Sequence, residues 1–371
     1  MTEPAPNPKA GLPELLGLPF PVRRHPGHAH MEVHLRHWAD QFGLTPTSET
    51  AQHLTASRFA AMAAHAYPSA PQPRADWAAD WITWLFLLDD QLEEGAHGSE
   101  NRWSEVIDAV RAVLRSPQAV GAAGPPLIRA WADLCSRVGP WATPAWKARF
   151  GAHLLESLHG ALQEIRLRDQ GIPPTLDEYT ALGRASSASL PVFDTVEICV
   201  GAELPEHLYN ITLYREFLHA AADVFCWSND LCSVQKERDA GMVTNLVLVL
   251  EHHDGLLPDE ALGAIRALIR RRVQDLLAAR EQLHHLEPSL SLPPAQARAL
   301  HQNVTALCEW LTGTLWWHTA GGTTRYKVTD PDSAPPPIAD LLTGPDDALP
   351  CHPGRREGDR VGQPGSVARR G

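Results

Sequence analysis

One stretch of this chain constrains the fold most: an apolar helix that carries polar residues at regular spacing, FCWSNDLCSVQKE over residues 225–237. Asn229, Ser233 and Glu237 recur every four residues, so on a helix each is turned about 40° from the one before, and all three share one stripe. The preceding run over residues 217–227 is apolar, which predicts a buried helix. Because buried polar groups need partners, we expect this stripe to face a ligand inside the fold.

The chemistry of this stripe favours a hard cation. A carboxamide oxygen, a hydroxyl and a carboxylate together supply too few ligands for Ca²⁺ but suit Mg²⁺, which keeps positions for water and phosphate oxygens. Lys236 lies beside the stripe and could hold a phosphate as a point charge. The alternative is an ordinary amphipathic helix with a polar face, because N-x3-S-x3-E also occurs by chance.

The length and residue pattern indicate one large all-α domain with tails. The chain has 371 residues, is rich in Leu and Ala, and shows no alternating strand pattern, so it can bury a sizeable helical core. We predict a disordered N-terminal segment over residues 1–17, a helical domain over residues 18–330, and a disordered tail over residues 331–371, where Pro, Gly, Asp and Arg dominate.

The charge and the cysteines exclude several classes of protein. A net charge of −12 and a pI near 5.9 argue against nucleic acid as a partner, because that requires a concentrated basic face. The six cysteines contain no C-x2-C pair, which indicates reduced thiols in a cytoplasmic protein. The N-terminus lacks the pattern of a signal peptide. No uncharged apolar run reaches the roughly 18 residues of a membrane span.

A second polar landmark ends the helix predicted over residues 74–94. The run D-D-Q-L-E-E begins at Asp89, so Asp89 shares a helix face with Glu93, and Asp90 shares one with Glu94. Like charges four residues apart repel, and carboxylates at a helix C-terminus oppose the helix dipole, each at a cost of about 0.3–1 kcal/mol. We therefore expect a positive partner here. A solvated acidic helix end is the alternative.

Two arginines could contact an anion. The helical segment over residues 176–200 contains Arg184 followed by SSASLP, and Ser and Pro inside an apolar helix predict a kink. Arg184 could clamp an anion with both arms of its guanidinium, or it could form a surface salt bridge. Arg325 and Tyr326 follow a Trp-rich helix and a Gly pair, on a loop that could close over a site.

With both landmarks placed, the chain resembles the class I terpene synthases of the bacterial type over roughly residues 18–330. Three motifs carry the resemblance: D-D-x-x-E from Asp89 to Glu93, N-D-x-x-S-x-x-K-E from Asn229 to Glu237, and the pair Arg325-Tyr326. The resemblance implies a helical bundle around a central apolar cavity, three Mg²⁺ ions, with Mn²⁺ as an alternative, and an isoprenyl diphosphate substrate. It also implies a monomer or a homodimer.

The resemblance assigns roles residue by residue. Asp89 looks like the carboxylate that bridges two ions, with Asp90 and Glu93 supporting it. Asn229, Ser233 and Glu237 look like ligands of the third ion. The predicted diphosphate contacts are Lys236, Arg325, Tyr326 and a sensing arginine, for which Arg184 is the candidate, with a kink at Ser187 and Ala188. The chain departs from the family pattern at Glu93, where Asp is usual and Glu94 is a further option, and at Ser187, where Asp is common.

The expected reaction is ionisation and cyclisation of farnesyl diphosphate to a sesquiterpene, with geranyl or geranylgeranyl diphosphate as alternatives. The predicted aromatic walls of the cavity are Phe86, Phe193, Trp316 and Trp317, with Phe225 as a further candidate, and core packing is the alternative for each. Three other functions remain open: a chain-elongating prenyltransferase, a phosphohydrolase suggested only by residues 252–254, and a non-catalytic helical interaction module.

Overall fold

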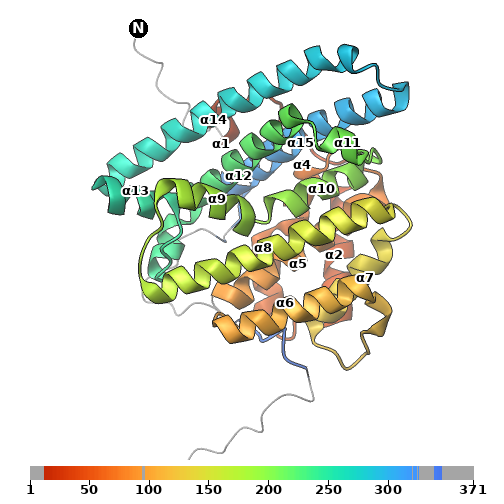
Figure 1. Ribbon diagram of the computed structural model, residues 1–371. Coiled ribbons are helices and arrows are strands. Elements are labelled where there is room, and N and C mark those ends of the chain that lie inside the picture. The colour runs from red at the N-terminus through yellow and green to blue at the C-terminus, as the bar shows by residue number, and fades with distance from the viewer. Residues whose placement is uncertain (1–11, 94–96, 320, 324, 326–337, 345–371) are drawn as a thin grey trace, which may run out of the picture.

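The computed structural model describes residues 12–93, 97–319, 321–323, 325 and 338–344, and every regular element in them is helical (Figure 1). The prediction of an all-α fold is therefore confirmed. Within the described residues, two short 3-10 helices accompany fifteen α-helices, which are α1 (Leu12–Leu16), α2 (His28–Phe42), α3 (Ser48–Ser57), α4 (Phe59–Ala66), α5 (Gln72–Glu93), α6 (Glu100–Arg115), α7 (Pro126–Val138), α8 (Pro144–Gln170), α9 (Leu176–Ser186), α10 (Ser189–Val200), α11 (Glu206–Tyr209), α12 (Thr212–Asp239), α13 (Leu246–Asp254), α14 (Pro258–Leu286) and α15 (Pro294–Thr319).

Local sequence signals set the ends of the long helix α8, which crosses the front of the molecule in Figure 1. The Thr143 side chain accepts a hydrogen bond from the Trp146 N–H, and Pro144 occupies the first turn, where its missing N–H costs nothing. Gly171 ends the helix in the left-handed region, which glycine adopts without steric cost. These local signals at residues 143–144 and 171 account for both ends of the helix.

A column of tryptophans fixes α5 in the core. Trp81 stacks on Trp84 with ring centroids 5.5 Å apart, and Trp84 stacks on Trp131 of α7 at 4.7 Å. Trp81 also meets the edge of Phe150 from α8 at 5.3 Å. Aromatic pairs in such arrangements add about 0.5–1.5 kcal/mol each beyond the area that they bury. This packing holds the helix whose C-terminal end carries the acidic run.

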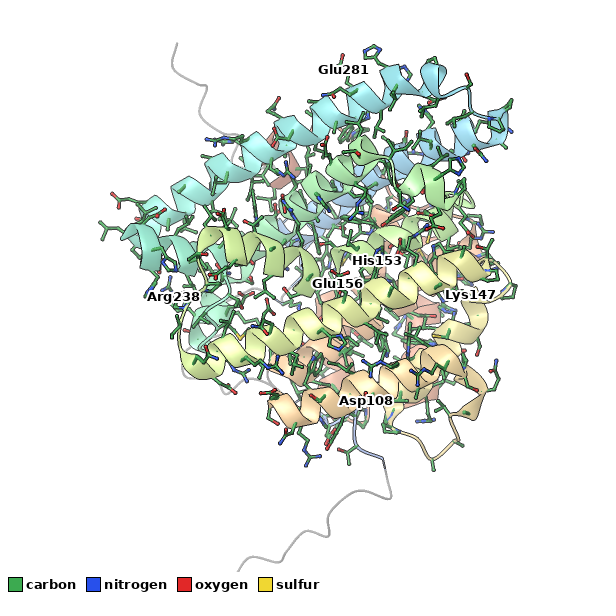
Figure 2. All side chains as sticks on the ribbon, in the orientation of Figure 1. Asp108, Lys147, His153, Glu156, Arg238 and Glu281 are labelled. Carbon is green, nitrogen blue, oxygen red and sulfur yellow. The ribbon has the colours of Figure 1, made fainter. Side chains whose placement is uncertain are left out.

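Charged side chains cover the outer helix faces. Asp108 of α6, Lys147 of α8 and Glu281 of α14 are exposed and project outward (Figure 2). Among the described residues, no helix combines the length and apolar character needed to cross a bilayer.

The kink predicted near Ser187 and Ala188 is present. It separates α9 from α10, and Ala188 has φ 54°, in the left-handed region. On the neighbouring helix α8, a Cβ added to Gly160 would lie 2.7 Å from the backbone N of Ser186. Only glycine therefore lets α8 approach the kink this closely.

The predicted N-terminal boundary is wrong by several residues. Residues 12–16, predicted to be disordered, form α1, and both Leu12 and Leu16 are buried. The Leu12 N–H also donates to Thr319 Oγ1 of α15 at 3.1 Å. The helical domain thus begins before residue 18. Residues 1–11 lie outside the described residues.

The predicted C-terminal tail also contains a packed segment, residues 338–344, which corrects the expectation for this part of the chain. Gln91 binds it with both ends of its amide: Nε2 donates to the Ala339 carbonyl, and Oε1 accepts from the Leu341 N–H, each at 3.0 Å. Leu341 is buried, and its carbonyl accepts from the Leu127 N–H. This segment therefore belongs to the folded domain.

The close approach of α8 to the kink gives a test of the fold. We expect Gly160→Ala to lower the free energy of unfolding by about 1–3 kcal/mol, the usual cost of overpacking, because the new methyl group meets backbone. Chemical denaturation measures the change. Gly263→Ala is the matched control: Gly263 is also in a helix, has nothing within 4 Å of its added Cβ, and should gain up to about 1 kcal/mol. Equal effects of the two substitutions would contradict the packing.

Candidate active site

A cavity of about 200 Å³ lies between helices α4, α5, α6, α8, α9, α10, α12 and α15. This volume is several times the share of about 30 Å³ that one water molecule takes in the liquid, so the cavity is more than a packing defect. Most of its walls are apolar and comprise Met62, Ile82, Leu85, Phe86, Leu88, Leu92, Trp103, Leu154, Leu158, Ala161, Val192, Phe225, Met242 and Trp310. The predicted central apolar cavity is therefore present.

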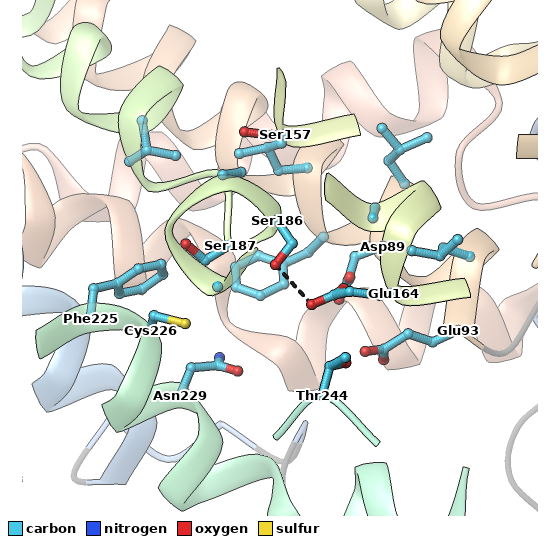
Figure 3. A pocket seen from close by; sticks show the side chains of 18 of the residues that line it. Asp89, Glu93, Ser157, Glu164, Ser186, Ser187, Phe225, Cys226, Asn229 and Thr244 are labelled. Carbon is cyan, nitrogen blue, oxygen red and sulfur yellow. Dashed lines mark hydrogen bonds between the residues drawn. The ribbon is translucent and has the colours of Figure 1, made fainter. Parts of the chain in front are cut away.

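The two polar landmarks of the sequence face this same cavity. Asp89 and Glu93 come from the last turns of α5, and Asn229 and Glu237 come from the C-terminal half of α12; all four line the cavity. In Figure 3, Asp89, Glu93 and Asn229 surround a shared space together with Glu164 of α8. The fold thus joins two motifs that are far apart in the sequence.

Short hydrogen bonds fix the side chains of the α12 stripe. Ser233 Oγ donates to the Asn229 carbonyl at 2.9 Å and lies 3.4 Å from Asn229 Oδ1. Asn229 Nδ2 lies 3.4 Å from His318 Nε2 of α15, and Glu237 Oε2 accepts from Asn245 Nδ2 at 3.0 Å. Asn229 and Glu237 line the cavity, whereas Ser233 is buried outside the lining.

The positive partner expected at the acidic run is present. Arg325 donates from Nη1 to Asp90 Oδ1 at 2.6 Å and from Nη2 to Asp89 Oδ2 at 2.8 Å. Its guanidinium also lies 4.7 Å from the centroid of the Phe86 ring, a favourable cation–π distance. Lys236 Nζ donates to Glu93 Oε2 at 2.8 Å. Arg325 and Lys236, which are predicted to contact diphosphate, are therefore paired with the carboxylates that are predicted to bind metal ions.

The carboxylates at the cavity outnumber these two cations. Burial and the nearby charges of Glu237, Asp230 and Asp89 raise the pKa of Glu164 to about 8. Partial burial at the cavity wall, followed by repulsion from Glu93, raises the pKa of Asp89. Burial and repulsion from Asp230 and Glu93 likewise raise the pKa of Glu237. Several carboxyl groups that face one cavity, and whose negative charge would exceed that of the two cations when they ionise, suit hard divalent cations.

Glu164 is a site residue that the sequence motifs missed. It lies on α8 and accepts a hydrogen bond from Ser186 Oγ at 2.8 Å, drawn as the dashed line in Figure 3. It lines the cavity together with Leu154, Leu158 and Ala161 of the same helix. A carboxylate that continues an apolar helix stripe is the signal that could have identified it.

Asp230, the second residue of the N-D motif, connects three elements. The Tyr179 hydroxyl of α9 donates to its carboxylate, as does the Leu246 N–H at 2.8 Å, at the start of α13. Asn245 Nδ2 donates to the Asp230 carbonyl at 3.0 Å. These bonds hold α9 and α13 against the helix that carries Asn229.

Arg184 is already paired within the protein. Its Nε and Nη2 donate to the two carboxylate oxygens of Asp223, at 2.6 and 2.7 Å, and Arg272 binds the same carboxylate. Arg184 is absent from the cavity lining, although Ser187 and Ala188 belong to it. The sequence predicted that both arms of the Arg184 guanidinium bind an anion. In the structure they bind the buried carboxylate of Asp223 on α12. Tyr326 and Glu94 lie outside the described residues.

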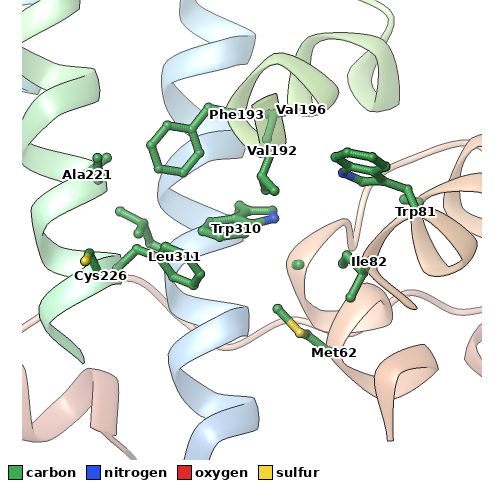
Figure 4. Packing of buried hydrophobic residues seen from close by; sticks show 14 of the residues in the cluster. Met62, Trp81, Ile82, Val192, Phe193, Val196, Ala221, Cys226, Trp310 and Leu311 are labelled. Carbon is green, nitrogen blue, oxygen red and sulfur yellow. The ribbon is translucent and has the colours of Figure 1, made fainter. Parts of the chain in front are cut away.

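Three of the predicted aromatic walls lie outside the cavity lining: Phe193, Trp316 and Trp317. Phe193 packs edge-on against Trp310 with centroids 5.4 Å apart (Figure 4). Trp317 donates from Nε1 to the Ser57 carbonyl at 3.0 Å, and Trp316 stacks on His65 at 3.8 Å. In this structure these three residues pack in the core. Phe86 and Phe225 line the cavity as predicted, and Trp310 does so without having been predicted.

Comparisons with known proteins agree with this geometry. A family model described as terpene synthase family 2, C-terminal metal binding, matches residues 80–275. Pristinol synthase from Streptomyces pristinaespiralis is 28% identical over 91% of this chain and 92% of its own length. A (+)-T-muurolol synthase from Roseiflexus castenholzii is 31% identical over 79% of this chain and 87% of its own length.

The solved structure of germacradien-4-ol synthase from Streptomyces citricolor superposes with a TM-score of 0.74 at 25% identity, covering 83% of this chain and 98% of that one. The chain therefore belongs to terpene synthase family 2, and the fold is the helical bundle of the class I terpene synthases. It is a terpene synthase, a lyase that cyclises isoprenyl diphosphates.

The raised pKa values predict how pH changes the stability of the metal-free protein. The folded carboxyls keep protons that the unfolded chain, with pKa values near 4, has already released at pH 6. Raising the pH from 6 to 9 therefore favours the unfolded state, and the free energy of unfolding in EDTA should fall.

Glu164→Gln should make this fall smaller, because the substitution removes a carboxyl with a pKa of about 8. Urea denaturation at several pH values measures the effect. Glu100→Gln is the control, because Glu100 is exposed and Arg166 lowers its pKa. A free energy of unfolding that is constant or rises over this pH range would exclude the charge excess.

Proposed function

We propose that this enzyme converts farnesyl diphosphate to a cyclic sesquiterpene and releases diphosphate in a Mg²⁺-dependent reaction. One observation carries the proposal: Asp89 and Glu93 from the end of α5, and Asn229 and Glu237 from the stripe of α12, line the polar part of one mainly apolar cavity. The farnesyl substrate is supported by the relative from Roseiflexus castenholzii, whose name describes it as cyclising (2E,6E)-farnesyl diphosphate.

The oxygen ligands at the cavity fit divalent metal ions, and the proposal is that three Mg²⁺ ions bind. Asp89, with Asp90 and Glu93 in support, would hold two of them, and Asn229, Ser233 and Glu237 would hold the third. The fit rests on the excess of enclosed carboxylates, because hard oxygen ligands with uncompensated negative charge favour Mg²⁺. Bound Mg²⁺ supplies electrostatic stabilisation of the departing diphosphate oxygens.

The cations of the chain would bind the diphosphate from the same side. Lys236 pairs with Glu93, and Arg325 pairs with Asp89 and Asp90. With metal ions bound to these carboxylates, the N–H groups of both cations would be available to diphosphate oxygens. Tyr326 follows Arg325 directly and is proposed as a further donor. For Arg184, the proposal is that it senses diphosphate through the kink at Ser187 and Ala188, which line the cavity.

The apolar walls would protect the carbocation. Phe86, Phe225 and Trp310 present aromatic groups to the cavity, and an aromatic face is worth about 2 kcal/mol or more to a desolvated cation. Phe225 and Trp310 support each other, with ring centroids 5.0 Å apart at an interplanar angle of 66°. A cavity closed by Arg325 would keep water from quenching the cation to an alcohol. Every motif residue comes from one chain, so either a monomer or a homodimer supplies a complete site.

The metal ligands give the first test of this function. We expect Asp89→Ala, Asn229→Ala and Glu237→Ala each to lower diphosphate release by at least about 100-fold, because each removes a ligand from a centre worth several kcal/mol of transition-state stabilisation. EDTA should abolish activity, and excess Mg²⁺ should restore it. The measurement is a coupled diphosphate assay. Glu100→Ala, which changes an exposed carboxylate away from the cavity, is the control, and undiminished turnover of the metal-free enzyme would exclude the mechanism.

The chain length of the substrate gives the second test. The enzyme should be incubated separately with geranyl, farnesyl and geranylgeranyl diphosphate, and the organic extracts analysed by gas chromatography with mass spectrometry. We expect a cyclic C15 hydrocarbon or alcohol from farnesyl diphosphate, with kcat/KM at least about tenfold higher than for the other two substrates. A higher value for the C10 or C20 substrate would contradict the farnesyl assignment and leave the terpene synthase assignment intact.

A further inference from the structure

A second group of metal-ligating side chains lies at the tip of the hairpin formed by α14 and α15. His284, Glu287 and His301 each place one ligand atom there, and these atoms all lie within 4.8 Å of one another. The rings of His284 and His301 have centroids 6.4 Å apart. Neither the motifs of the sequence nor the proposed function involves these residues.

The chain geometry explains how these residues come together. His284 is in the last turn of α14, and Glu287 begins the short 3-10 helix Glu287–Leu290 that follows. Residues three positions apart at a helix end face the same side. Ser291, with φ 49° in the left-handed region, lies between that helix and α15, which brings in His301. The group therefore spans two helices.

The three side chains lie in a small hollow at the tip of the hairpin. His284, Glu287 and His301 line a hollow whose apolar walls comprise Leu277, Leu283, Leu300 and Val304. Two charged residues, Arg280 and Glu281, also line it. The Arg280 guanidinium lies 5.2 Å from the centroid of the Phe20 ring, whereas Glu281 adds a second carboxylate to the hollow.

The hairpin tip is remote from the polar part of the active site. His318 of α15 contacts Asn229, and His301 lies on the same helix. At a rise of about 1.5 Å per residue, the two histidines are about 26 Å apart along the helix axis. An ion at the hairpin tip therefore cannot take part in the reaction at Asp89 and Asn229.

We propose that His284, Glu287 and His301 bind a divalent transition-metal ion, with Zn²⁺ as the preferred ion. Two imidazole nitrogens and one carboxylate are ligands that Zn²⁺ accepts, whereas Mg²⁺ prefers an all-oxygen set. Three protein ligands leave a fourth position to water. The ion would cross-link the end of α14 to α15 and stabilise the folded state, because a ligand that binds only the folded state shifts the unfolding equilibrium.

Calorimetric titration of Zn²⁺ into the full chain tests the proposal. The protein should carry no histidine tag and should be stripped with EDTA, then dialysed into excess Mg²⁺ so that the oxygen ligands of the active site are occupied. We expect one Zn²⁺ to bind with a micromolar or lower Kd. His301→Ala and His284→Ala should each weaken binding at least tenfold. His285→Ala is the matched control, because His285 is an exposed neighbour that lies 3.7 Å from Glu281 and outside the group.

Thermal unfolding gives an independent readout. Zn²⁺ at ten times the wild-type Kd should raise the Tm of the wild type and of His285→Ala equally, and should raise the Tm of His301→Ala by less than a third as much. Glu237→Ala should keep the wild-type Zn²⁺ affinity, which separates this site from the active site. Equal Zn²⁺ affinity in the wild type, His284→Ala and His301→Ala would overturn the proposal, as would loss of binding in Glu237→Ala alone.

Discussion

The structure depends on one electrostatic constraint: carboxylates from three helices share a cavity that is otherwise apolar. Asp89 of α5, Glu164 of α8 and Glu237 of α12 all line it, and mutual repulsion contributes to the raised pKa of each. Such a cluster is unfavourable by itself, so positive charge must compensate it. Arg325 and Lys236 supply part of that charge from within the protein, and the family model that matches the chain is described as metal binding.

The rest of the fold holds these charges in place. The stacked tryptophans fix α5, whereas hydrogen bonds of Asp230 fix α12 to α9 and α13. On the far side of the cavity, Gly160 lets α8 pack directly against the kink between α9 and α10. Rigid aromatic packing on one side and backbone contact on the other leave the cavity with defined walls. Defined walls are what a cyclisation reaction requires, because the folded shape of the prenyl chain selects the product.

The sequence predicted the helices and the motif residues that face the cavity better than it predicted the tertiary contacts of individual side chains. Spacing alone placed Asn229 and Glu237 on one helix face, and charge repulsion at Asp89 predicted the cation that Arg325 supplies. Sequence periodicity could not show which of the tryptophans on α15 faces the cavity. Trp310 lines the cavity, whereas Trp316 stacks on His65. Glu164 was missed because its partners come from other helices. The packed segment at residues 338–344 was missed because its short apolar run, IADLLTG, lies within a tail dominated by Pro, Gly, Asp and Arg.

The two contacts of the C-terminal region with the end of α5 have a kinetic consequence. Arg325 pairs with Asp90, and residues 338–344 bind Gln91, the next residue of the same helix. The chain between these contacts therefore begins and ends at one place. Because Gln91 holds residues 338–344, Arg325 stays tethered to the end of α5 even when it is not paired with Asp90, so its pairing with this carboxylate is an intramolecular step.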